Sequence, residues 1–207
     1  MTAREQILAK ARAALGAGGS ALPAARIRVP EVAVEARIEA LFRAVTALAG
    51  KTVLAASPAE AREYVASLIG AGPAVASNSP VLRECGIDGL AAVQTGFTDR
   101  DALHAACAAA AFGITSADYA LADTGTLAML ASREEARLVS LLPPVHVAIV
   151  PRARILTGLD ELFATVPLPG DVTSSMVLIT GPSRTADIEQ ILVRGVHGPG
   201  EIHVVVL

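Results

Sequence analysis

The sequence predicts an α/β domain in which a parallel or mixed sheet is covered by helices on both faces. Short apolar segments alternate with longer amphipathic segments through the first half of the chain, which is typical of this class. Hydrophobic residues make up 53% of the 207 residues and aromatic residues only 3%, which suits alanine-rich helices packed on a Val/Ile/Leu sheet. A chain of this length buries roughly 70% of its unfolded surface, so its core needs no disulfide or metal.

The N-terminal segment predicts a helical arm outside that domain. Residues 2–15 place their apolar side chains on one stripe, as in an amphipathic helix, and the glycine-rich residues 16–20 end it. One short helix is not stable alone, so we expect it to dock on its own domain or on a partner. The predicted organisation is residues 1–25 as a helix with a flexible linker and residues 31–207 as the domain.

Helices and strands alternate from residue 31 to residue 117. The predicted helices cover about 31–48, a stretch from Pro58, a short stretch after Pro80, and 99–111. The predicted strands that follow them are 52–56, 74–77, 90–93 and 113–116.

The pattern changes after residue 117. Two apolar strands, 119–123 and 126–130, flank the dipeptide Thr124-Gly125, which predicts a β-hairpin. The remaining expected elements are strands at 145–150, 176–180 and 201–207 and helices at about 158–165 and 183–194. The last strand, helix and strand predict a right-handed crossover that adds to a parallel sheet.

Charge and cysteine usage exclude several classes of function. The net charge is −3, the sequence pI is about 5.8 and no basic stripe occurs, so we expect no nucleic-acid partner. Cys85 and Cys107 stand in no CxxC pattern and cannot by themselves hold an iron–sulfur cluster or a structural zinc, and no metal site is expected. Without an apolar signal region or a run of bilayer length, the chain is predicted to be cytoplasmic with no membrane span.

The first candidate site is the sequence Asp123-Thr124-Gly125-Thr126. Asp-Thr-Gly also occurs in aspartic proteases, but those are all-β proteins that need two carboxylates sharing a proton. One interpretation is a tight turn in which Asp123 bonds nearby backbone. The other is that the Asp123 carboxylate and the two threonine hydroxyls line a pocket at a strand end.

The second candidate site begins at Gly181-Pro182-Ser183, where a strand is followed by the expected helix. Ser183 suits the N-cap, and the free amides of a helix start can bind phosphate or carboxylate. The alternative is an ordinary capped helix, and Asp187 would oppose a bound anion. His197 follows in a turn with glycines on both sides, where an imidazole can serve as acid, base or hydrogen-bond donor, or stand as a plain surface residue.

Five ordered blocks of the sequence resemble the LUD-domain family, in its lactate-utilisation protein C branch. The resemblance covers about residues 31–207. The blocks are Thr-Ser-Ala-Asp at 115–118, Ala-Asp-Thr-Gly-Thr-Leu at 122–127, Leu-Pro-Pro-Val-His-Val at 142–147, Gly-Pro-Ser-Arg-Thr-Ala-Asp-Ile-Glu at 181–189 and Gly-Val-His-Gly-Pro at 195–199.

The resemblance implies a three-layer fold like that of glucosamine-phosphate isomerase, ribose-phosphate isomerase and CoA-transferase domains. It implies a role in the bacterial oxidation of L-lactate to pyruvate beside two partner subunits that carry iron–sulfur clusters. We assign predicted catalytic roles to Asp123, Asp187, Glu189 and His197. The predicted ligand-binding residues are Thr124, Gly125, Thr126, Gly181, Ser183 and Thr185.

Three hypotheses of function remain open at this point. The first is a subunit without a cluster of its own, which binds a small carboxylate or phosphate-bearing ligand at strand ends. The second is a stand-alone enzyme of the isomerase or CoA-transferase type, with Asp123, Asp187 or Glu189 as base or nucleophile. The third is an interaction module that uses the N-terminal helix. The site prediction requires the hairpin turn, Ser183 and His197 to meet at one cavity.

Overall fold

The computed structural model describes residues 2–15, 27, 29–166, 173–185 and 193–207. The helices of the described residues are α1 (Ala3–Leu15), α2 (Val34–Ala47), α3 (Pro58–Ile69), α4 (Pro80–Glu84), η1 (Ile87–Gly89), α5 (Arg100–Ala109), α6 (Arg137–Leu141), η2 (Arg152–Arg154) and α7 (Leu159–Thr165). The strands are β1 (Lys51–Leu54), β2 (Ala74–Ala76), β3 (Val93–Gln94), β4 (Phe112–Ser116), β5 (Tyr119–Leu121), β6 (Thr126–Leu130), β7 (Val145–Val150), β8 (Ile155–Leu156), β9 (Met176–Thr180), β10 (Arg184–Thr185), β11 (Val193–Arg194) and β12 (Glu201–Val206).

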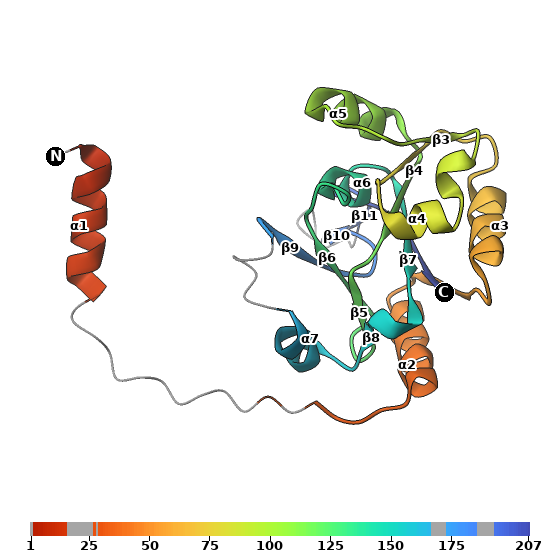
Figure 1. Ribbon diagram of the computed structural model, residues 1–207, viewed down its shortest axis with the longest axis horizontal. Helices are drawn as coiled ribbons and strands as arrows, with labels where there is room; N and C mark the ends of the chain where they lie inside the picture. Colours follow the sequence, from red (N-terminus) through yellow and green to blue (C-terminus); the bar gives the residue numbers. More distant parts are fainter. Residues whose placement is uncertain (1, 16–26, 28, 167–172, 186–192) are drawn as a thin grey trace.

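A six-stranded sheet forms the centre of the molecule (Figure 1). Its strand order is β1-β12-β7-β4-β2-β3, and every neighbouring pair is parallel. The connections that lead into it carry short capped helices: Ser57 accepts from Glu60 N at the start of α3, and Asp99 accepts from Ala102 N at the start of α5. The predicted α/β class with a parallel sheet is therefore confirmed.

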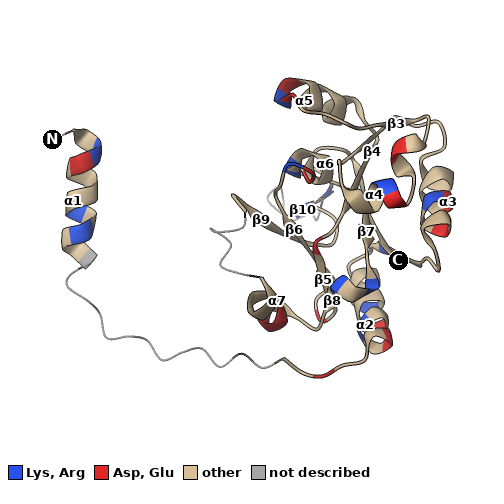
Figure 2. Ribbon diagram, viewed as in Figure 1, with Lys and Arg blue, Asp and Glu red and all other residues tan. Residues whose placement is uncertain are grey.

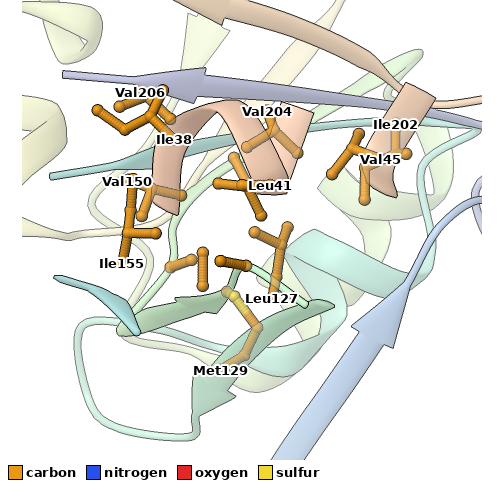
Figure 3. Close-up of a cluster of buried hydrophobic side chains, with 14 residues drawn as sticks. Ile38, Leu41, Val45, Leu127, Met129, Val150, Ile155, Ile202, Val204 and Val206 are labelled. Carbon is orange, nitrogen blue, oxygen red and sulfur yellow. The ribbon is translucent and has the colours of Figure 1, made fainter. Parts of the chain in front are cut away.

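Helices cover both faces of this sheet. On one face, α3, α4 and η1 pack against the inward side chains of β2, β4, β7 and β12. On the other face, α2 fills the space between β12, β7 and the β5–β6 hairpin, where Leu41 is fully buried (Figure 3). Successive side chains of β12 enter different cores, with Val204 on the α2 side and Val205 on the α3 side. Because both faces of the strand are buried, its sequence is a continuous apolar run.

A second sheet of four strands packs on the α2 side, in the order β8-β5-β6-β9. The predicted hairpin is present, since β5 and β6 are antiparallel. Its connection is longer than predicted, because Leu121 pairs with Thr126 and leaves residues 122–125 in the turn. Gly125, at φ 68°, lies directly against the backbone of α2, which leaves no room for a side chain.

The predicted helix at 183–194 is wrong at both described ends. Residues 184–185 and 193–194 are the antiparallel strands β10 and β11, with Arg184 opposite Arg194. A continuous helix would separate these two residues by about 15 Å instead of pairing them. Ser183 donates its N–H to Pro199 O at 2.8 Å and accepts from Gly195 N at 3.0 Å, so its backbone is bound to the turn that follows β11.

The predicted crossover is wrong as well. Strand β9 pairs antiparallel with β6 in the second sheet, whereas β12 lies between β1 and β7 in the central sheet. The segment between β9 and β12 therefore joins two different sheets and does not form a right-handed crossover within one.

The described side chains of α1 are all exposed, including Ile7 and Leu8 of its apolar stripe. Whether this arm docks on a partner stays a prediction. Acidic and basic residues are mixed over the helices, without a continuous band of one sign in the view of Figure 2. In the described part of the chain, no helix combines the length and the apolarity that crossing a bilayer requires.

Candidate functional site

Three of the sequence-predicted residues line one cavity on the β9 side of the molecule. Gly181, Ser183 and His197 border a cavity of about 320 Å³. The cavity is bounded by β9, by residues 181–184 and by the turn at 197–199. The His197 side chain is exposed, whereas the neighbouring Pro182 is buried. The structure therefore brings these three residues together, and their roles stay a prediction.

The hairpin turn does not line that cavity. The Asp123 and Thr124 side chains are exposed, and Gly125 packs on α2. The turn reaches the cavity only indirectly: Thr124 Oγ1 lies 2.8 Å from Thr126 Oγ1, which lies 2.8 Å from Thr180 Oγ1 on the cavity wall. The hairpin turn therefore does not meet Ser183 and His197 at one cavity, as the sequence predicted. Three threonine hydroxyl groups connect the turn to the cavity wall.

The other predicted site residues lie elsewhere. Thr185 is in β10, opposite Val193, and is not among the residues that line the cavity. Asp187 and Glu189 lie outside the described residues.

A different group of polar residues gathers at the carboxyl edge of the central sheet, where open α/β sheets bind ligands. One cavity there has a volume of about 640 Å³ and follows the ends of β2 and β3. We call it the arginine cavity, because Arg83 of α4 and Arg133 of the loop after β6 both line it. Its remaining lining residues are Asn78, Asp88, Thr95, Gly96, Phe97, Thr98 and Glu134.

Asn78 fixes the floor of the arginine cavity. Its Oδ1 accepts from Gly96 N at 2.8 Å and from Thr95 Oγ1 at 3.2 Å, and its Nδ2 donates to Phe97 O at 3.2 Å. The Asn78 side chain therefore ties the loops after β2 and β3 together. Neither Arg83 nor Arg133 has an ion-pair partner within the described ranges, which leaves both guanidinium groups available to an anion.

A second cavity of about 430 Å³ adjoins the first, since Glu134 lines both. We call it the Glu135 cavity. It lies beyond the ends of β2, β4 and β7, and its lining residues are Ser79, Pro80, Val81, Ser116, Ala117, Asp118, Ser132, Glu134, Glu135, Pro151 and Arg154.

Glu135 is buried under this cavity, with 8% of its surface exposed. Its Oε1 accepts from Ser116 N at 2.9 Å and from Ser116 Oγ at 2.6 Å, and Ser116 Oγ lies 2.6 Å from Ser79 Oγ. Its Oε2 has no hydrogen-bond partner among the described residues. A short turn holds the residue in place, because Ser132 Oγ accepts from Glu135 N at 3.0 Å.

Burial raises the pKa of Glu135 to about 7. The hydrogen bonds from Ser116 favour the ionised form, and the neighbouring Asp118 opposes it. Burial also raises the pKa of Asp118, although its carboxylate accepts from Leu130 N at 2.6 Å. A carboxyl that is half protonated near neutral pH is suited to exchange a proton with a ligand.

Sequence reasoning missed Glu135 because nothing local marks it. It stands in a polar loop after β6, a strand of the second sheet, and reaches the central sheet only through the fold. The sequence did contain one signal for this site. Ser77 and Ser116 end predicted parallel strands and Ser79 follows one closely, and ligands bind at that edge of a parallel sheet.

The two cysteines are not placed to bind a cluster. Cys85 packs in the core on the α3 side and Cys107 in a separate core beside α6, and burial raises the pKa of both thiols. Within the described residues, no three His, Cys, Asp or Glu side chains are grouped as metal ligands would be.

Comparison with known proteins identifies the family. The family model described as the LUD domain matches residues 38–207. A Lactate utilization protein C from Anoxybacillus flavithermus is 33% identical over 156 residues, which are 72% of this chain and 70% of that protein. Another from Bacillus licheniformis is 42% identical over 91 residues, which are 42% of this chain and 38% of that protein.

A solved structure shows the same fold. The crystal structure of a DUF162 family protein from Deinococcus radiodurans superposes with a TM-score of 0.65 at 18% identity, over 85% of this chain and 99% of that one. At that identity the likeness supports the fold alone, whereas the family model covers most of the chain. The chain belongs to the LUD domain family.

Proposed function

We propose that this chain acts in lactate utilisation as a subunit that binds a small carboxylate at the carboxyl edge of its central sheet. The names of its relatives support the process. The arginine cavity supports the ligand class, because two guanidinium groups from separate elements line one space. Arginine binds carboxylates through paired, charge-assisted hydrogen bonds.

Titration calorimetry with L-lactate and pyruvate tests the binding. Losing one charge-assisted hydrogen bond costs about 1.5–3 kcal/mol, so Arg83→Gln and Arg133→Gln should each weaken binding by about tenfold or more. Arg43→Gln is the matched control, since Arg43 is exposed on α2 and lines neither cavity. Equal affinities in all three variants would contradict the proposed site, and inorganic phosphate should be titrated in parallel to separate the two anion classes.

The subunit role requires partners that carry iron–sulfur clusters. With two buried cysteines in separate cores, this chain offers no thiolate set for such a cluster, so electron transfer would belong to other chains. A tagged chain purified from lactate-grown cells should bring with it protein that shows the electron paramagnetic resonance signal of reduced clusters. Purification of the chain alone under those conditions would count against this role.

Glu135 favours a second candidate function, a stand-alone enzyme of the isomerase or CoA-transferase type. A buried carboxyl beside a cavity can act as base or nucleophile, a role that the sequence assigned to other acids. Turnover of sugar phosphates or acyl-CoA esters by the purified chain, lost in Glu135→Gln, would favour this alternative over the first.

A further inference from the structure

The Glu135 cavity contains a chain of hydrogen-bonding groups that leads from a buried carboxyl to the cavity wall. Glu135 Oε1 contacts Ser116 Oγ, and Ser116 Oγ contacts Ser79 Oγ, each at 2.6 Å. Ser79 is also fixed from the other side, because its Oγ accepts from Val81 N at 3.2 Å. All three side chains line the same cavity, and all three are at least nine-tenths buried.

The direction of the hydrogen bonds between Glu135, Ser116 and Ser79 depends on whether the Glu135 carboxyl is protonated. When Glu135 is ionised it only accepts, so Ser116 donates to it and Ser79 donates to Ser116. Ser79 Oγ is then left to accept from a ligand hydroxyl. When Glu135 carries a proton it can donate to Ser116, which donates to Ser79, and Ser79 is left to donate to a ligand carbonyl.

We propose that Glu135, Ser116 and Ser79 form a reversible relay that recognises the oxygen on the second carbon of a 2-hydroxy or 2-oxo acid. This inference rests on the proposed function, since it assumes that the chain binds a small carboxylate, and it places that ligand where the two cavities meet at Glu134. The proton that sets the relay comes from solvent, and no bond of the ligand breaks. The ionised relay suits the hydroxyl of L-lactate, and the protonated relay suits the carbonyl of pyruvate.

The surroundings of Glu135 allow both the ionised and the protonated form of its carboxyl near neutral pH. The charged groups that also line its cavity are Asp118 from the connection between β4 and β5, Glu134 from the same loop as Glu135, and Arg154 from η2. Two acids and one base leave the cavity without the excess positive charge that would hold Glu135 ionised. The unpaired Oε2 likewise gives the ionised form no added support.

Proton exchange measured by calorimetry tests the relay. Titrations in buffers of different ionisation enthalpy report the protons taken up per ligand bound. With a pKa near 7, pyruvate should take up about 0.9 proton at pH 8 and about 0.1 at pH 6. L-lactate should show the opposite sign, releasing about 0.9 proton at pH 6.

Variants of the full chain separate the outcomes. Glu135→Gln should abolish the exchange with both acids, and Ser79→Ala should abolish it while leaving the carboxyl in place. Glu63→Gln, an exposed glutamate on α3, should keep it. Unchanged exchange in Glu135→Gln overturns the relay and leaves the proposed function standing, whereas absence of binding by the wild-type chain overturns both. If Glu135→Gln does not fold, Ser79→Ala alone decides.

Discussion

Glu135 should make the stability of the protein depend on pH. Its pKa of about 7 lies above the ordinary value of 4.5, so the folded chain binds this proton more tightly than the unfolded chain. The stability it contributes is complete below pH 4.5 and is lost as the pH rises through 7, a difference of about 3 kcal/mol. Urea denaturation of Glu135→Gln should lack this decline. Parallel pH profiles for variant and wild type would contradict the raised pKa.

His146 should act in the opposite direction. Burial lowers its pKa to about 4, its Nε2 lies 2.9 Å from Thr115 Oγ1, and its Nδ1 is unpaired among the described residues. The folded chain therefore resists protonation, and stability is lost as the pH falls from 6.5 through 4. His146→Gln should lose less stability over that interval, as followed by circular dichroism during acid titration. An unchanged acid transition would show that other groups control it.

These residues show what local sequence cannot predict. Ser79 and Ser116 are 37 positions apart, and Glu135 is 19 positions from Ser116. Their meeting depends on the order of strands in the sheet. By contrast, Gly181, Ser183 and His197 were grouped from the sequence, although for another reason: the sequence predicted a helix after Ser183, whereas in the structure the turn after β11 returns the chain to Ser183.

At the scale of elements, the hairpin turn depends on the absence of a side chain at Gly125. A Cβ there would lie 2.8 Å from Val45 N and 2.9 Å from Ala44 C, at a φ of 68°. Gly125→Ala should therefore destabilise the protein by about 2–4 kcal/mol, the sum of overpacking and backbone strain.

Two other glycines separate these causes. Gly96 has a φ of 79° but open space around its Cβ position, so Gly96→Ala should show strain alone, about 1 kcal/mol. Gly89 has neither constraint, and Gly89→Ala should change little. Thermal denaturation that ranked the three variants in another order would contradict this account.

The elements were predictable where periodicity and caps agree. Strand β7 and helix α3 follow the expected ranges because an apolar run and a Ser-Pro start mark them. The segment from 183 to 194 failed because its apolar spacing resembles a helix, while backbone bonds of Ser183 to the distant Pro199 and Gly195 select strands at its ends.

At the scale of the molecule, the sequence predicted one sheet where the fold has two main ones. The hairpin and β9 close over α2 and complete a core with β7 and β12, as Figure 3 shows. Apolar periodicity reports that a strand is buried, but it does not report which sheet the strand joins. The class of fold was therefore predictable, and the partition into sheets was not.

The N-terminal arm gives the last prediction. Every described side chain of α1 is exposed, and the family match begins at residue 38, within α2. A chain that starts at residue 31 keeps every buried hydrophobic residue of the part that the structure describes, the first of which is Ile38. Its melting temperature in calorimetry should therefore equal that of the full chain within about 2 °C, since surface changes alter stability by no more than about 0.5 kcal/mol. A clear drop in the truncated chain would mean that the apolar stripe of α1 is covered in solution by its own domain or by a second copy.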